Sequence, residues 1–178
     1  MVVENTFITG LKLIHLNKYL DDRGSFMKVF DADFFEENGL ETKFKESYFS
    51  ISNKNVIRGM HLQIPPVEHT KLVYVNQGKL LDVILDVRKD SPYFGKYFTV
   101  ELDTRNPLVV YIPVGCAHGF LSLEDQTMMT YLQTTCYNPI YDTGISYNSF
   151  GMNWGIGNPI ISARDKGFLS LKKFENPF

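Results

Sequence analysis

Short β-type segments that follow one another at regular intervals most restrict how this chain can fold. From residue 71 to residue 135 they are separated by turns, with no helical pattern between them. Consecutive parallel strands need long crossovers, usually helices, so the pattern favours an antiparallel sandwich or barrel. The strands expected here are residues 71–75, 80–87, 97–102, 108–112, 119–123 and 128–135.

The segments on either side fit the same architecture. We expect early strands within 7–20, 26–30, 44–52 and 58–61, long ordered loops over 137–154, and short helices at 31–39 and 162–171. With no linker or repeat, residues 1–178 are expected to form a single all-β domain, a jelly-roll barrel with short helical additions.

Composition excludes several classes of protein. A formal net charge of −2 argues against a general nucleic-acid or membrane-surface binder, and no apolar run is long enough to span a membrane. The N-terminus has no signal-peptide pattern. The only cysteines, Cys116 and Cys136, fit a reducing compartment. A cytoplasmic location is therefore expected.

Polar chemistry concentrates in two places along the predicted strands. Residues 57–75 form two β-type runs joined by a Pro-Pro turn, and they contain Arg58, His61 and Lys71. Residues 113–120 contain His118. Cations and histidines at the mouth of a β framework suit an anionic ligand and proton transfer. A glycine next to Arg58 would let the backbone approach a bound ligand closely.

Each candidate also has an ordinary structural explanation. His61 and Tyr131 could be core residues, His118 incidental to a turn, Asp165 part of a helix capping box, and Arg23 a solvated turn residue. Only their joint occurrence points to a site.

Six motifs occur in a familiar order: Asp22–Phe26, Ile57–Gln63, Thr70–Val73, Leu81–Arg88, Gly115–Phe120 and Ile161–Asp165. Through them the chain resembles, nearly from end to end, the dTDP-4-dehydrorhamnose 3,5-epimerase family of nucleotide-sugar enzymes. The resemblance implies a cupin-type jelly roll and a homodimer. It also implies a nucleoside-diphosphate-linked 4-keto sugar as substrate, with no metal and no organic cofactor.

The resemblance also implies residue roles. His61 corresponds to the general base, Asp165 to the carboxylate that orients it, Tyr131 to the proton donor on the opposite face, and Lys71 to the cation at the enolate oxygen. The residues expected to bind substrate, some of them lent by a partner subunit, are Arg23, Phe26, Lys28, Glu46, Tyr48, Arg58, Gln63, His118 and Tyr137.

The implied reaction requires these residue types. Inverting a carbon next to a ketone means removing a proton from one face and returning one to the other. The intermediate is an enolate, which a fixed cation stabilises. A His–Asp pair, a tyrosine and a lysine meet these needs.

Some positions depart from the family pattern. The family commonly has Phe-x-Gln-x-Asn-His-Ser where this chain has Phe44 to Ser50, and so presents Glu46 and Tyr48 instead. Lys28 replaces a usual glutamate, and Tyr147 and Ser149 replace a tryptophan and an aspartate. Several of these changes fall where the nucleotide base is expected. The substrate could therefore be a thymidine, guanosine or cytidine diphosphate sugar, and the sugar could be a hexose or a heptose.

Three alternatives stay open as well. One is an epimerase that inverts only C3 or only C5. Another is a metal-dependent cupin, with His61, Glu68 and His118 as possible ligands. The third is a non-catalytic sugar-binding cupin, which would need neither an acid nor a base.

Overall fold

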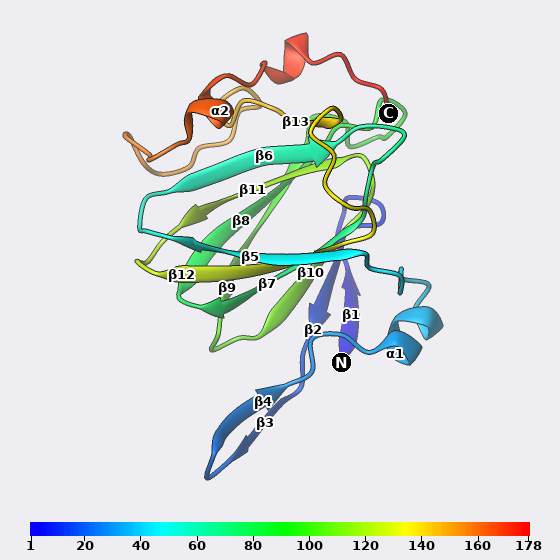
Figure 1. Cartoon of the computed structure of the whole chain (residues 1–178), viewed down its shortest axis with the longest axis vertical. Helices are drawn as coiled ribbons and strands as arrows, with labels where there is room; N and C mark the ends of the chain where they lie inside the picture. Colours follow the sequence, from blue (N-terminus) through cyan, green and yellow to red (C-terminus); the bar gives the residue numbers. More distant parts are fainter.

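A computed structural model describes residues 1–178, and its body is two antiparallel sheets that face each other (Figure 1). The six-stranded sheet runs in spatial order β1 (Val2–Asn5), β2 (Lys12–His15), β10 (Leu108–Ile112), β7 (Lys71–Gln77), β12 (Thr127–Gln133) and β5 (Glu46–Ser52). The five-stranded sheet runs β13 (Asp142–Gly144), β6 (Ile57–Gln63), β11 (Cys116–Ser122), β8 (Lys79–Asp86) and β9 (Tyr97–Asp103). The all-β jelly-roll prediction is confirmed.

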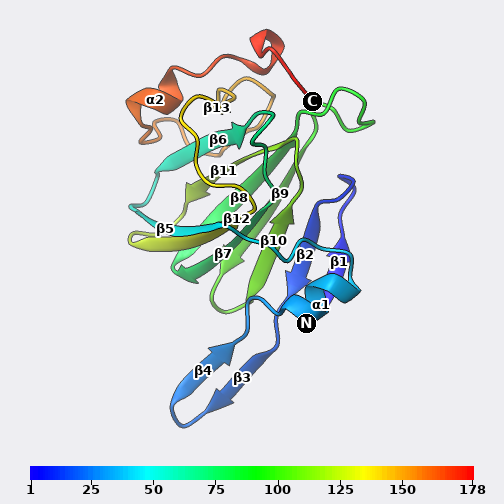
Figure 2. The ribbon, with the colours of Figure 1, turned by 45° about the vertical axis from the view of Figure 1, so that its right-hand side comes forward.

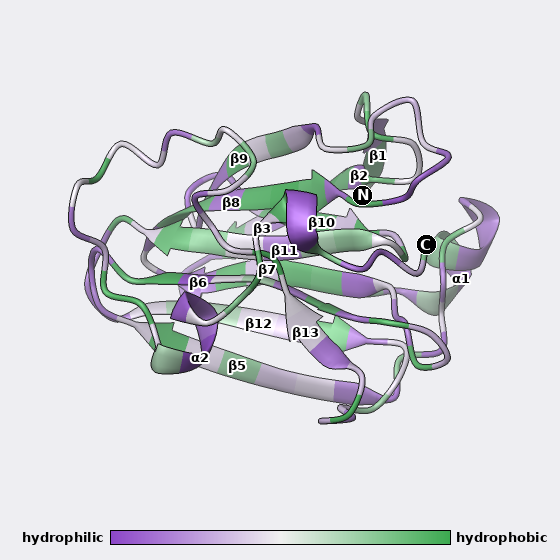
Figure 3. Ribbon diagram, turned by 90° about the horizontal axis from the view of Figure 1, so that it is seen from above, coloured by the Kyte–Doolittle hydropathy of each residue, from purple (hydrophilic) through white to green (hydrophobic).

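Three apolar layers hold these sheets, one between them and one on the outer face of each. The central layer joins the inner faces of both sheets, with Val73 and Ile84 among its members. The outer face of the five-stranded sheet is covered by the C-terminal third, including Trp154. The sequence of β8 is an almost continuous apolar run because this strand is buried on both faces. Figure 3 shows hydrophobic residues gathered on β7 and β8.

The helices are short. α1 (Ala32–Glu37) begins at Asp31, whose side chain accepts from the Phe34 amide, and it buries Phe35 against the six-stranded sheet. The helix expected over 162–171 is only α2 (Ala163–Lys166), followed by a 3-10 turn at Leu171–Lys173. The intervening chain is extended because Leu169 forms a β-bridge with Ile145.

Other boundaries also differ from the expectation. β11 begins at Cys116, three residues before the expected start at residue 119. Its pairing with β8 starts at Cys116 opposite Asp86 and continues through His118. β13 lies within the predicted loops, since its three residues pair with β6, and β1 is too short for its sequence to reveal it. Long-range pairing sets these strands.

A two-stranded hairpin stands apart from both sheets. β3 (Lys18–Asp21) and β4 (Gly24–Met27) pair only with each other and project from the body (Figures 1 and 2). Leu20 and Phe26 are 74% and 63% exposed on it. An isolated hairpin is marginally stable in water, so these apolar side chains favour a contact beyond this chain.

No helix of the chain combines the length and apolar character needed to cross a membrane.

Candidate active site

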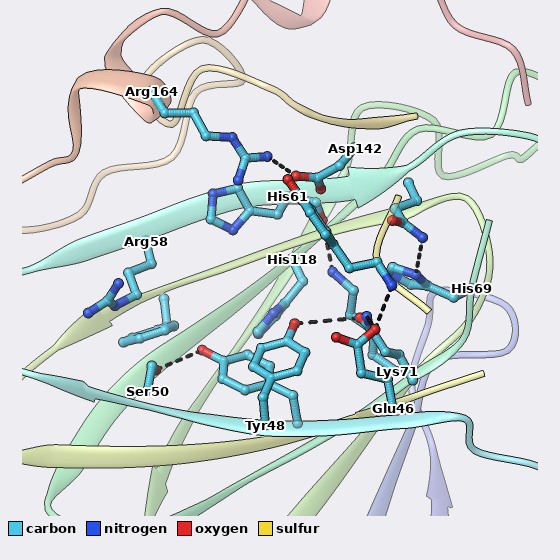
Figure 4. Close-up of a pocket in the computed structure, with 15 residues that line it drawn as sticks. Glu46, Tyr48, Ser50, Arg58, His61, His69, Lys71, His118, Asp142 and Arg164 are labelled. Atoms are coloured by element: carbon cyan, nitrogen blue, oxygen red, sulfur yellow. Dashed lines mark hydrogen bonds and ion pairs between the residues drawn. The ribbon is translucent and has the colours of Figure 1, made fainter. Parts of the chain in front are cut away.

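A cavity of about 400 Å³ lies between the two sheets (Figure 4). One wall comes from β5, β7 and β12, the other from β6 and β11, and the segment after β12 and helix α2 close the rim. The residues that line it are Glu46, Tyr48, Ser50, Arg58, His61, Gln63, His69, Lys71, His118, Phe120, Tyr131, Gln133, Tyr137, Asp142 and Arg164. His61, Lys71, His118 and Tyr131 therefore converge on one cavity, as the fold prediction required.

A β-bulge turns two β6 side chains into this cavity. Opposite β6, β11 places His118 against His61 and Phe120 against Arg58, so three positions on β6 span two on β11. Arg58 and His61, which would face opposite sides in a regular strand, thus both line the cavity. Gly59, at φ +114°, lies in the bulge. Its close neighbour is the β11 backbone, which corrects the expectation of a ligand there.

His61 is held from behind by Asp165. The Asp165 carboxylate lies 2.9 Å from His61 Nε2 and also accepts the Gly59 amide at 3.0 Å. The Asp165 amide donates to the Ser162 cap, so the residue both caps α2 and orients a histidine. Burial raises the pKa of Asp165, but hydrogen bonds led by that with His61 outweigh it and lower the pKa.

The His61 ring is poised as a neutral base. Burial lowers its pKa, Asp165 counteracts this effect, and Lys71 and Arg164 lower it further. Because Nε2 faces a carboxylate, it carries the proton of the neutral ring, and Nδ1 is the unprotonated nitrogen. At neutral pH the ring can therefore accept a proton.

Tyr131 faces the cavity from the other sheet. Its hydroxyl is 3.1 Å from Ser50 Oγ, and its ring stacks on Tyr48 with centroids 4.7 Å apart. Burial raises the pKa of Tyr131, so the phenol keeps its proton at neutral pH. A proton acceptor and a proton donor thus stand on opposite walls.

Lys71 adds a buried cation to the same cavity. It is 6% exposed and donates to the His61 carbonyl at 3.3 Å. Burial lowers its pKa to about 8. At neutral pH the ammonium is still mostly charged, so it can stabilise an oxyanion in the cavity.

His118 forms a second His–Asp pair, which the sequence did not reveal. Its Nε2 lies 2.6 Å from Asp82 Oδ1, both side chains are buried, and Asp82 Oδ2 has no hydrogen-bond partner. The signal that could have found Asp82 is a charged residue within the apolar run of β8.

The expected substrate-binding residues separate into two groups. Glu46, Tyr48, Arg58, Gln63 and Tyr137 line the cavity with His118. The Gln63 side chain forms hydrogen bonds within the protein: it donates to the Val67 carbonyl and accepts from the Asn138 amide. These bonds hold the rim of the cavity in place.

Arg23, Phe26 and Lys28 do not reach the cavity of their own chain. They lie on or just after the β3–β4 hairpin, where Arg23 pairs with Asp21 and Lys28 with Asp31. None of the three lines this chain's own cavity. A role in a neighbouring subunit's cavity stays a proposal.

Six cavity residues were missed: Ser50, His69, Phe120, Gln133, Asp142 and Arg164. Strand alternation could have found two, since Ser50 follows Tyr48 by two positions and Gln133 follows Tyr131 likewise. Arg164 and Asp142 form an ion pair between α2 and β13, which only the tertiary structure brings together.

His69 is a neutral donor in the cavity wall. Its Nδ1 lies 3.2 Å from the Gln63 side-chain nitrogen, an amide donor, and its Nε2 is buried without a partner. Burial lowers its pKa to about 2.

The alternative metal site does not form. His61 and His118 both line the cavity, but Glu68 does not, and no group of three or more His, Cys, Asp or Glu side chains is arranged to hold a metal ion.

Comparisons with known proteins agree with this geometry. The family model described as dTDP-4-dehydrorhamnose 3,5-epimerase matches residues 5–173. The enzyme of that name from Methanothermobacter thermautotrophicus is 38% identical over 97% of this chain and 94% of its own length. A structure of the Sulfolobus tokodaii enzyme has 39% identity and a TM-score of 0.90, covering 97% of both chains. A Legionella pneumophila dTDP-6-deoxy-D-glucose-3,5-epimerase, in complex with dTDP-4-keto-L-rhamnose, has 34% identity and a TM-score of 0.93, covering 98% of this chain and 94% of its own. This chain therefore belongs to the dTDP-4-dehydrorhamnose 3,5-epimerase family.

Proposed function

We propose that this chain is an isomerase that inverts C3 and C5 of a nucleoside-diphosphate-linked 4-keto-6-deoxy sugar, in the biosynthesis of a surface-polysaccharide sugar. The observation that carries the proposal is the opposition of His61 on β6, paired with Asp165 of α2, and Tyr131 on β12, with the Lys71 ammonium in the same cavity. Such an arrangement can remove a proton from one face of a sugar ring and return one to the other.

In the proposed mechanism, His61 Nδ1 takes the proton from a carbon next to the ketone. The electron pair moves into the C–C bond and the carbonyl becomes an enolate, whose oxygen Lys71 stabilises. Asp165 stabilises the resulting imidazolium. Tyr131 then protonates the same carbon from the opposite face and the ketone re-forms. Solvent exchange resets His61 and Tyr131, and the sequence repeats at the second carbon.

Deuterium exchange in D₂O, followed by NMR, tests the assignment of acid and base. His61→Asn should abolish deuterium uptake at C3 and C5, with turnover lower by about 10²- to 10⁴-fold. Tyr131→Phe should still exchange, because His61 can return a deuteron to the face it came from, but should not invert at least one carbon. Wild-type exchange by His61→Asn, or normal inversion of both carbons by Tyr131→Phe, would overturn the assignment.

The same assay identifies the nucleotide and the carbons inverted. Glu46 puts a carboxylate on the cavity wall, where the family commonly has glutamine. A panel of dTDP-, GDP- and CDP-linked 4-keto sugars, hexose and heptose, should therefore give a clear order of kcat/KM. Exchange at one carbon alone would identify a C3-only or C5-only epimerase.

We also propose that residues 1–178 act as one domain, that two copies form a homodimer, and that the hairpin of each contributes Arg23, Phe26 and Lys28 to the other's cavity. The projecting hairpin and its exposed apolar residues support this arrangement. The two unpaired cysteines, Cys116 and Cys136, support a cytoplasmic location.

A further inference from the structure

Tyr48 lies directly against the residue assigned as the proton donor. In the pairing of β5 with β12, Tyr48 is opposite Tyr131. Their rings stack with centroids 4.7 Å apart and planes 16° apart, which is a nearly parallel arrangement. Both side chains line the cavity, and Figure 4 shows Tyr48 on the wall opposite His61.

Tyr131 is buried, and its ring makes two aromatic contacts of different geometry. The contact with His118 is edge-to-face, with centroids 6.1 Å apart, whereas the contact with Tyr48 is stacked. The Tyr131 hydroxyl has one hydrogen-bond contact, with Ser50 Oγ at 3.1 Å. The stacked Tyr48 ring opposes a change in the plane of the Tyr131 ring, because stacked rings lose contact area and favourable geometry when one of them rotates.

Tyr48 is itself anchored along the same two strands. Its hydroxyl lies 3.5 Å from Gln133 Oε1, and Gln133 Nε2 donates to Glu46 Oε2 at 3.1 Å. The same Glu46 oxygen accepts the Tyr137 amide at 2.5 Å. The contacts therefore run from the Tyr131 ring to the backbone at the cavity rim.

We propose that Tyr48 is a positioning residue that holds the Tyr131 ring so that its hydroxyl meets the sugar carbon on the face opposite His61. The inference rests on the proposed epimerase function. It assigns Tyr48 to the protonation step and not to substrate affinity. A small displacement of a catalytic group is enough to slow a reaction strongly, so loss of the stack should be visible in turnover.

The test compares Tyr48→Phe, which keeps the stacked face, with Tyr48→Leu, which removes it. Three quantities are measured for each: inverted product, deuterium uptake at the same carbon, and KM. We expect Tyr48→Leu to slow inversion by about 10- to 100-fold, while uptake driven by His61 and KM change less than about threefold. Tyr48→Phe should restore inversion to within about threefold of wild type.

A matched control removes one ring of an aromatic pair outside the cavity. Tyr97 and Phe150 contact edge-to-face at 5.7 Å on the far side of the five-stranded sheet, so Tyr97→Leu should leave the ratio of inversion to exchange unchanged. Tyr48→Thr, which keeps a strand-forming residue, replaces Tyr48→Leu if that variant does not fold.

Three kinetic outcomes contradict the inference: equal loss of inversion and exchange, a raised KM with unchanged kcat, or no effect. Crystal structures of the variants give a separate measure, since the Tyr131 ring should shift in Tyr48→Leu and keep its place in Tyr48→Phe. If the wild type turns over no 4-keto sugar, the proposed function fails. The crystal structures then still show whether Tyr48 holds the Tyr131 ring in place.

Discussion

Two opposing effects act on the protonation of His61. Burial and the nearby cations Lys71 and Arg164 favour the neutral ring, whereas Asp165 favours the imidazolium. A general base needs both properties, since it must be neutral before the reaction and charged during it. The Asp165 carboxylate is 4% exposed and held by the Gly59 amide, so it is positioned to stabilise the charged imidazolium during the reaction.

Replacement of that carboxylate should weaken the base without removing it. Asp165→Asn keeps the size of the side chain and an oxygen for the Gly59 amide, but leaves the imidazolium without a counter-charge. We expect kcat for inversion to fall by about 10²- to 10⁴-fold, with deuterium exchange falling in parallel. Thermal melting should confirm the fold, and an exchange rate equal to wild type would contradict the role.

The charge on Lys71 should give the reaction an alkaline limit. Burial lowers its pKa to about 8, so deprotonation as the pH rises through about 8 removes the cation from the cavity. kcat/KM should fall over this range. It should also fall on the acidic side, as His61, whose pKa burial lowers, becomes protonated.

The Lys71→Arg variant identifies the group behind the alkaline limit. A guanidinium stays charged because its pKa is above about 12. The residual activity of this variant should therefore persist above the pH at which the wild type declines. An unchanged alkaline limb would assign that titration to another group.

At the scale of elements, the site depends on how closely β6 and β11 approach each other. A Cβ at Gly119 would lie 2.7 Å from the Arg58 carbonyl oxygen and 2.7 Å from the Met60 sulfur. The same short approach supports the bulge that directs Arg58 and His61 into the cavity.

Gly119→Ala should therefore disturb both stability and activity. We expect a loss of about 1–3 kcal/mol in the free energy of unfolding, because the backbone of a packed sheet must shift. Turnover should fall as His61 is displaced. Gly157→Ala is the control, since a Cβ there meets nothing within 4 Å. Denaturant unfolding of both variants measures the difference, and equal stability would contradict the close approach.

At the scale of the whole molecule, the exposed hairpin suggests that the working unit contains two chains. One chain alone leaves Arg23 and Phe26 away from its cavity and an apolar face on β3–β4 uncovered. An isologous dimer, in which each hairpin crosses to the other body, would resolve both at once.

Mixed dimers distinguish a shared site from a separate one. His61→Asn and Arg23→Ala should each be impaired as homodimers. If Arg23 acts in the partner's cavity, a heterodimer of the two variants contains one intact site. Co-expressed chains that pair at random should then recover about a quarter of wild-type activity, because half the dimers have one working site of two. No recovery in purified heterodimers, or a fully active monomer by light scattering, would refute the shared site.

The sequence by itself determined the fold class and most of the candidate residues. Strand spacing and turn residues are local, so the antiparallel β architecture followed from them. Strand alternation shows which side chains share a face, and places Tyr48 with Ser50 and Tyr131 with Gln133. Motif resemblance added His61, Lys71 and Asp165.

Only the tertiary structure decided how these residues meet. Asp165 contacts His61 across more than a hundred residues of chain, Asp82 contacts His118 from the neighbouring strand, and the stack of Tyr48 on Tyr131 depends on the pairing of β5 with β12. A local pattern defines the faces of a strand but not its neighbour or register. Bulges such as that at Gly59, and bridges such as that at Leu169, depend on contacts between distant segments, and local sequence does not specify those contacts.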